Sequence, residues 1–235
     1  MPLAALLDRP EWADPVVRYL IEHGLAGTLR ISAVALVLSS LIGITLGTLL
    51  TIRFMPTRAL IRLYIEVWRG LPIIVTLFIV YFGAPVISTR FELDPYAAGA
   101  VTLTLWGSAQ IAEATRGAVQ SISRGQHEAA SALGFGWIGR HVFVILPQAT
   151  RRLIPPLVSL LVGIILNTTL IGIIGGSELL EASKRMVEVV NAPAPAGFGD
   201  RGEFQIYTFV MLVFFVICFP LTRLAAWLER RLVRT

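Results

Sequence analysis

The sequence predicts an all-α, polytopic membrane protein with five transmembrane helices in a single domain that covers residues 1–235. Hydrophobic residues make up 55% of the chain and charged residues only 15%, whereas soluble domains carry about 25% charged residues. Five stretches of at least 18 residues contain no Asp, Glu, Lys or Arg, and a helix needs roughly 20 residues to cross a membrane. The alternating segments of about ten residues that are typical of a membrane β-barrel are missing.

We expect the spans at about residues 28–52, 71–88, 95–112, 153–176 and 204–223. Residues Val16–Ala26 are predicted to form a short amphipathic helix on the outer surface before the first span. Gly70 and Pro72 predict a helix break just before the second span.

The third span is expected to continue as helix beyond the membrane, where Glu113 and Arg116 are three residues apart and can pair on one face. Glycines at the end of the fourth span predict a bend, followed by an amphipathic helix over residues 178–190. A connector rich in Pro and Gly then leads to the fifth span.

The basic residues predict the orientation of the chain. The net charge is +5 and the isoelectric point is near 10.0. If the spans alternate, 13 Lys and Arg residues fall on the side of residues 53–70, 113–152 and 223–235, against six on the other side, with Arg30 at a span edge. The positive-inside rule places the N-terminus outside and the C-terminus in the cytoplasm. The basic charge is therefore explained by topology, and no nucleic-acid partner is expected.

Missing motifs exclude several classes of activity. The sequence has no H-E-x-x-H, no G-x-S-x-G and no P-loop, and its single cysteine, Cys218, permits no internal disulfide. We expect no catalytic residue and no metal site. A pump of this sequence needs energy from a partner or from an ion gradient, and the spans lack the ionisable groups that gradient-driven carriers place at mid-membrane depth. A gradient-driven amino acid carrier and a structural or assembly protein remain as alternatives.

The long cytoplasmic segment 124–147 is the most informative part of the chain. Gln126–Leu133 contains good helix formers, and Gly134 is well placed to end that helix in a left-handed conformation. Small alanines allow a partner to approach closely, and Glu128 suits the N-terminal turn of the helix. Leu146 and Pro147 are expected to end a second short helix. From composition alone, an interfacial helix without a partner explains the segment equally well.

The residues of this segment resemble a known family. Glu128-Ala129-Ala130, then Gly134, then Val144-x-Leu146-Pro147 resembles the EAA loop of ATP-binding-cassette importer permeases, with Val144 where Ile is usual. Segments 65–83, 110–134, 146–157 and 167–179 are similar to the polar amino acid permease subfamily, with Thr169 where Ser is common. These segments occur in the order of the family, and the resemblance covers roughly residues 25–232.

The resemblance implies an import complex in the bacterial inner membrane. Its expected parts are a second permease subunit (an identical copy or a paralogue), two cytoplasmic ATP-binding-cassette ATPase subunits, an extracytoplasmic solute-binding protein and membrane lipid. This chain would bind no cofactor, since ATP and Mg²⁺ would be held by the partner ATPase. The implied substrate is a polar or charged amino acid or a close analogue. The resemblance assigns coupling to the ATPase to Glu128, Ala129, Ala130, Gly134, Leu146 and Pro147.

An amino acid zwitterion needs hydrogen-bond partners along its pathway. The candidates that the spans and their inner ends offer are Thr104, Ser108, Gln110, Glu113, Arg116, Asn167, Thr168 and Thr169. Any single Ser or Thr is better explained by a hydrogen bond to its own helix backbone. Asn167 is the strongest candidate because a buried amide in lipid needs a partner, although a neighbouring helix supplies one equally well.

Overall fold

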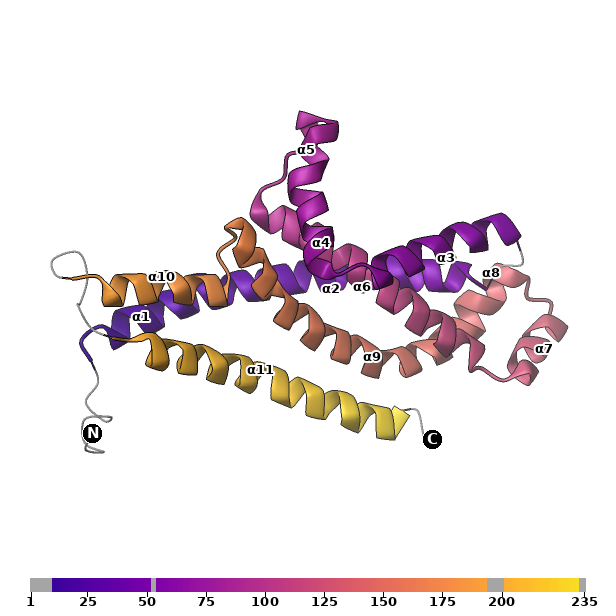
Figure 1. The fold of residues 1–235 in the computed structure, drawn as a ribbon. Coiled ribbons are helices and arrows are strands. Elements are labelled where there is room, and N and C mark those ends of the chain that lie inside the picture. Colours follow the sequence, from indigo (N-terminus) through magenta and orange to yellow (C-terminus); the bar gives the residue numbers. More distant parts are fainter. Residues whose placement is uncertain (1–9, 52–53, 194–200, 233–235) are drawn as a thin grey trace.

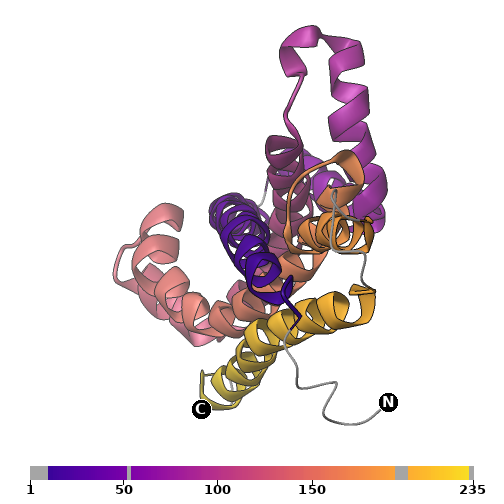
Figure 2. The ribbon, with the colours of Figure 1, turned by 90° about the vertical axis from the view of Figure 1, so that its left-hand side faces the viewer.

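The computed structural model describes residues 10–51, 54–193 and 201–232, and this part of the chain is helical, without a strand. Its first helical run extends from Ala13 to Leu49 and consists of α1 (Ala13–Tyr19), the π-helical segment η2 (Leu20–Leu25) and α2 (Ala26–Leu49). Figures 1 and 2 show this run at the centre of the molecule, with the other helices around it. The separate surface helix expected over Val16–Ala26 is therefore the beginning of the first long helix.

The next elements contain the predicted break. Helix α3 (Met55–Gly70) meets the run of α4 (Ile73–Phe78), η3 (Ile79–Gly83) and α5 (Ala84–Ile87) at an angle of 105°. The residue before Pro72 is extended, as the proline ring requires, so the break predicted from Gly70 and Pro72 is confirmed. The run α4–α5 projects away from the remaining helices (Figure 1), and the 3₁₀ turn η4 (Thr89–Phe91) follows it.

Helix α6 (Pro95–Gln120) packs along α2 over most of its length. Asp94 caps its start by accepting hydrogen bonds from the backbone N–H groups of Tyr96 (2.9 Å) and Ala97 (3.1 Å). The two helices approach closely because α2 presents Ser39, Gly43 and Gly47 four residues apart to α6. Helix α6 continues well beyond residue 112, as the sequence predicts.

The segment 124–147, which is predicted to couple to the ATPase (the predicted coupling segment), folds as α7 (Arg124–Ala132), α8 (Trp137–Gly139) and the π-helical segment η5 (Arg140–Ile145). It joins α9 (Leu146–Asn167) and the 3₁₀ segment η6 (Thr168–Ile174). The helical run is continuous from Trp137 to Ile174, so the expected helix end at Leu146 and Pro147 is wrong. A proline inside an α-helix removes one hydrogen bond and clashes with the preceding turn. The π-helical turn accommodates Pro147, since the N–H of Leu146 bonds to the carbonyl of His141, five residues back.

The chain then bends at Gly175, which has a φ of +83°, and returns as α10 (Leu179–Asn191). The bend and the amphipathic helix predicted after the fourth span are confirmed. Helix α10 buries Leu179 and Val190 against the first helical run and α11 (Glu203–Leu232). This outer cluster and the central core between α2, α6 and α9 are separate hydrophobic cores.

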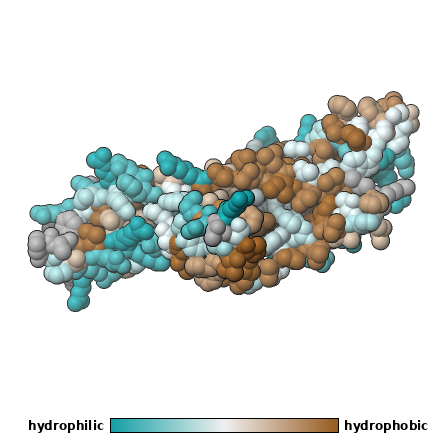
Figure 3. All heavy atoms as spheres, turned by 90° about the horizontal axis from the view of Figure 1, so that it is seen from above, coloured by the Kyte–Doolittle hydropathy of each residue, from teal (hydrophilic) through white to brown (hydrophobic). Residues whose placement is uncertain are grey.

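Three helical runs of the described residues are long and apolar enough to cross a membrane: Ala13–Leu49, Trp137–Ile174 and Glu203–Leu232. The bent pair α3 and α4–α5 raises this number to four if it counts as one span. Helix α6 has 26 residues but is not among them, because its Gly, Ser, Thr and Gln residues lower its mean hydropathy. The predicted number of five spans is therefore not confirmed. Figure 3 shows hydrophobic residues over the middle of the molecule and mainly hydrophilic residues over the end at its left.

Candidate functional site

The end of α7 has a specific hydrogen-bonding pattern. The N–H of Phe135 donates to the carbonyl of Ala130 (3.1 Å), and the N–H of Gly134 donates to the carbonyl of Ser131 (3.0 Å). These two bonds form a Schellman motif, which requires a left-handed residue at its centre. Gly134 has a φ of +84°, so its predicted conformation is confirmed.

Helix α7 is attached to the long run Trp137–Ile174 by polar side chains. Arg140 donates to the hydroxyl of Ser131 (2.9 Å), and Gln148 donates to the side-chain oxygen of Gln126 (3.2 Å). Arg152 donates to the carbonyl of Ser121 at the end of α6 (2.8 Å). The first two bonds attach α7 to η5 and α9, whereas the bond of Arg152 and a buried apolar cluster attach η5 and α9 to the end of α6, from which the chain enters α7.

A pair of histidines lies at the junction of α7, η5 and the end of α2. His141 is buried, donates from Nδ1 to the carbonyl of Trp137 (2.8 Å), and its Nε2 lies 3.0 Å from the hydroxyl of Thr51. The ring of His127 lies beside it, with centroids 6.2 Å apart. Burial lowers the pKa of His127, and the charge of Arg140 adds to this effect. Nothing in the sequence pattern indicated this pair.

The surface of the predicted coupling segment combines one acidic group with apolar side chains. Glu128 and Ala129 are exposed, whereas Ala130 packs inward with 2% of its surface accessible. Leu133, Ile138 and Phe143 are exposed at 78%, 72% and 70%. They lie in the predicted cytoplasmic segment, outside the expected spans, where lipid does not explain their exposure. Leu146 is half-buried and Pro147 exposed at the start of α9.

Two of the candidate pathway residues form the predicted pair in the C-terminal part of α6. Arg116 donates through Nε to Glu113 (3.0 Å) and through Nη1 to the side-chain oxygen of Gln120 (2.6 Å). Glu113 and Arg116 line a pocket of about 270 Å³ together with side chains of α3, which are Arg62, Ile65, Glu66 and Arg69. The pocket is therefore lined by three arginines and two glutamates.

The other pathway candidates do not gather around this pocket. Gln110 accepts a hydrogen bond from Arg69 (3.1 Å) and lines a different, mostly apolar pocket of about 350 Å³ between α6 and α9. Thr104, Ser108, Asn167 and Thr168 line neither pocket.

The hydrogen bonds of these side chains explain why the candidates do not gather around one pocket. Asn167 donates to the carbonyl of Gly163 in its own helix (2.7 Å), and Thr168 donates to the carbonyl of Ile165 (2.7 Å). Thr169 likewise donates to the carbonyl of Leu166 (2.8 Å). Ser108 lies 2.7 Å from the hydroxyl of Tyr64 on α3. Thr104 is buried, and its hydroxyl has no partner in the described part of the chain.

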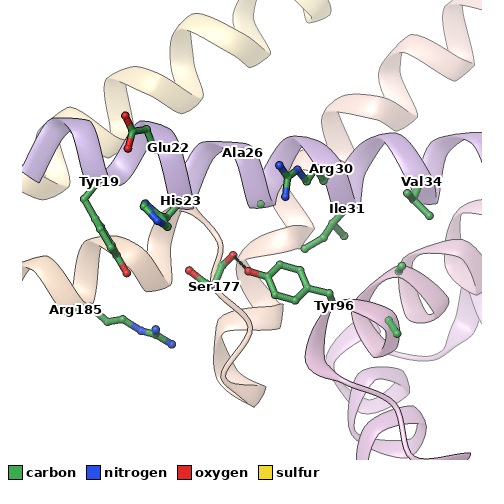
Figure 4. Close-up of a pocket in the computed structure, with 13 residues that line it drawn as sticks. Tyr19, Glu22, His23, Ala26, Arg30, Ile31, Val34, Tyr96, Ser177 and Arg185 are labelled. Atoms are coloured by element: carbon green, nitrogen blue, oxygen red, sulfur yellow. Dashed lines mark hydrogen bonds between the residues drawn. The ribbon is translucent and has the colours of Figure 1, made fainter.

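A third pocket, of about 730 Å³, is larger than these two and contains none of these candidates. It lies between the first helical run, the start of α6 and α10 (Figure 4). Arg30 and Arg185 are among its lining residues, and the hydroxyl of Tyr96 donates to the carbonyl of Ser177 at its wall (2.8 Å). Arg30, a charge at the edge of an apolar run, was the only sequence signal for this site.

Comparisons with known proteins agree on one family. Residues 29–234 match the family described as "Binding-protein-dependent transport system inner membrane component". The chain is 34% identical over 212 residues to the probable glutamine ABC transporter permease protein GlnM of Bacillus subtilis (strain 168), covering 90% of this chain and 93% of that protein. It is also 34% identical over 218 residues to the glutamine transport system permease protein GlnP of Escherichia coli (strain K12), covering 93% and 94%.

Solved structures have the same fold. A chain from a crystal structure of an amino acid ABC transporter with histidines matches with a TM-score of 0.78 and 25% identity, over 95% of this chain and 100% of that chain. A chain of the MetNI methionine ABC transporter in an inward-facing conformation matches with a TM-score of 0.70 over 94% of this chain. That match is 19% identical and supports the fold alone.

Proposed function

The chain belongs to the family of inner membrane components of binding-protein-dependent transport systems, and on this premise we propose that it is the permease subunit of an ATP-driven importer for a polar or charged amino acid. The full-length similarity to two glutamine permeases supports this function over a gradient-driven carrier. The observation that supports the mechanistic part of the proposal is a series of hydrogen bonds that joins α7 to the run Trp137–Ile174 and that run to the end of α6.

Helix α7 has the properties of a lever between an ATPase and the membrane helices. The helix and its C-cap residue expose Glu128, Ala129 and Leu133, which are all accessible to a partner. Because hydrogen bonds join α7 to η5 and α9, and α9 to the end of α6, a displacement of α7 would move α6 and α9 together. Rigid-body displacement of this kind is a common way to switch between two states of a protein.

The proposed complex contains a second permease, two cytoplasmic ATPase subunits and an extracytoplasmic solute-binding protein. ATP and Mg²⁺ would be bound by the ATPase, because the sequence of this permease has no P-loop. In this arrangement α7 faces the cytoplasm together with the C-terminus, and the N-terminus lies outside. The residues proposed to transmit the motion remain Glu128, Ala129, Ala130, Gly134, Leu146 and Pro147.

The substrate pathway is proposed to pass the polar residues of α6 and α9. Asn167 is half-buried, and its Nδ2 donates to its own helix, which leaves its Oδ1 as an acceptor for a substrate ammonium group. Glu113 and Arg116 would line the inner end of the pathway, where charged side chains of α3 surround them. Thr104, Ser108, Gln110 and Thr168 remain candidates along the same helices.

Reconstitution tests the proposed function. The permease is placed in liposomes with its proposed partner ATPase and binding protein, and uptake of radiolabelled glutamine and arginine is measured with and without internal ATP. We expect uptake only when ATP, ATPase and binding protein are all present. Uptake driven by a proton gradient in liposomes that contain the permease alone would contradict the proposal and favour a gradient-driven carrier.

A further inference from the structure

The pocket between α1–α2, α6 and α10 has a charged end and an apolar end. Along the first helical run its lining residues are Tyr19, Glu22, His23, Ala26, Gly27, Arg30, Ile31 and Val34, which form one continuous stripe. At 1.5 Å per residue, this stripe is about 22 Å long. Ala97 and Ala100 of α6 continue the apolar end. An elongated pocket of this kind fits an amphiphile better than a compact solute.

The charges at the polar end are positive. Arg30 is exposed and has no hydrogen-bond or ion-pair partner in the described part of the chain. Arg185 has one long hydrogen bond, from Nε to Glu181 (3.4 Å), and Figure 4 shows it on the opposite side of the pocket from Arg30. The only carboxylate in the lining, that of Glu22, is held by Arg18 at 2.8 Å. Glu181 pairs with Arg185, so Arg30 is the lining arginine that has no counter-charge in the described part of the chain.

The pocket lies where a lipid headgroup would be found. Arg30 is followed by 22 residues without a charge, so it marks one edge of the hydrocarbon layer. Tyr19 and Tyr96 lie on the same side of that edge, and tyrosines are enriched at the depth of the headgroups. Val34 is 49% exposed, so the apolar end of the pocket opens to the surroundings of the helix.

We propose that this pocket binds one anionic phospholipid, with the phosphate at the guanidinium of Arg30, additional positive charge from Arg185 on the opposite side, and one acyl chain along Ile31, Val34 and Ala100. A zwitterionic amino acid fits less well, because Glu22 is already paired and no free carboxylate in the lining receives an ammonium group. The bound lipid contacts the first helical run and α10 at the end of the molecule opposite to α7 (Figure 1) and stabilises their relative position.

Native mass spectrometry of the purified transporter complex tests the proposal. The complex is mixed with phosphatidylglycerol or with zwitterionic phosphatidylethanolamine, and bound lipid is counted for the parent protein, for the double variant Arg30→Gln/Arg185→Gln and for the control Arg90→Gln. Arg90 is exposed and does not line the pocket. We expect retention of phosphatidylglycerol to fall about fivefold for each lining arginine removed and to stay unchanged in the control.

A second variant keeps the test independent of charge. Ala100→Phe fills the apolar end of the pocket without altering any charge, and we expect it to lower phosphatidylglycerol binding as well. Equal retention of both lipids, unchanged binding in the double variant or an equal loss in Arg90→Gln would overturn the proposal. Displacement of the lipid by free glutamine would assign the pocket to a solute instead.

Discussion

Gly134 illustrates how a single residue determines the end of the coupling helix. Its φ of +84° permits the two hydrogen bonds that terminate α7 and turn the chain toward Trp137. A Cβ at this position would meet no other atom within 4 Å, so the requirement for glycine comes from the backbone conformation alone.

We expect Gly134→Val to cost about 1–3 kcal/mol at the end of α7, because a β-branched residue is strained at positive φ. The variant should reach the membrane in normal amounts and co-purify with less ATPase. Gly125→Ala is the matched control, since Gly125 lies in α7 without a positive φ and with open space around it. Equal loss of ATPase in both variants would assign the effect to helix composition and not to the left-handed turn.

The histidine pair predicts a pH dependence of α7. The pKa of His127 is lowered by burial and by Arg140, with His141 as its other titratable neighbour. When α7 is detached from η5, His127 has the ordinary histidine pKa of about 6.5 and binds a proton more readily than in packed α7. The stability that His127 contributes to the packing of α7 is therefore fully present above this pKa and decreases as the pH falls. Hydrogen exchange, corrected for intrinsic rates, should show less protection of α7 at about pH 5.5 than at about pH 7.5. In His127→Gln this difference should shrink; an unchanged difference would exclude His127 as its cause.

For single residues, features that depend on neighbours in the sequence could be predicted, whereas contacts between distant segments could not. The left-handed Gly134 and the pair Glu113–Arg116 follow from residues within one helical turn. The hydrogen bond between Thr51 and His141 joins residues 90 positions apart. Spacing along a helix indicates which residues share a face but not which other helix that face meets.

Among the elements, α2 and α6 pack closely against each other. A Cβ on Gly43 would lie 2.6 Å from the Cβ of Ile111, and one on Gly47 would overlap the carbonyl oxygen of Ala112. Small residues spaced four apart allow two membrane helices to approach in this way.

We expect Gly47→Val to destabilise the permease by about 1–3 kcal/mol, because the added atoms force α2 away from α6. The thermal midpoint of the detergent-solubilised protein is the measurement. Gly117→Ala is the control: it lies on α6 with no atom within 4 Å of its added Cβ, and its midpoint should be unchanged or higher. A midpoint for Gly47→Val equal to that of the parent protein would contradict the close packing.

The elements also show which sequence signals were sufficient to predict where a helix breaks. Gly70 with Pro72, and the glycines after Ile174, marked real breaks because both change the backbone itself. Pro147 did not end its helix, since a π-helical turn accommodated it, and sequence periodicity does not reveal such a turn. Helix α6 illustrates a further difficulty, because a helix packed on several sides contains small residues and has a low hydropathy.

For the whole molecule, the distribution of Lys and Arg predicts the orientation in the membrane. With an odd number of crossings, the N-terminus lies outside and the C-terminus in the cytoplasm, on the side of α7. Alkaline phosphatase fused to the N-terminal end and a cytoplasm-active reporter fused to the C-terminus should therefore both be active. Termini on the same side would indicate an even number of crossings and would overturn the assignment of α7 to the cytoplasm.

The whole molecule also explains why the pathway could not be derived from one chain's sequence. The predicted coupling segment lies within one continuous stretch, so its motif is visible in the sequence. The polar candidates are spread over α6 and α9, and several bond to their own helices in the structure. Hydrophobic side chains of α4–α5 such as Phe82 and Val86 are exposed at 58% and 85%, which fits the proposal that a second permease completes the pathway.

The central claim is that α7 transmits the motion of the ATPase to the pathway. Its most direct test measures ATP hydrolysis by the reconstituted complex with and without solute-loaded binding protein, for the parent permease, for Glu128→Lys and for the control Glu229→Lys. Glu229 is exposed near the C-terminal end of α11, so this variant makes the same charge reversal outside α7. We predict that stimulation by the binding protein is lost in Glu128→Lys and retained in Glu229→Lys; full stimulation and transport in Glu128→Lys would contradict the account.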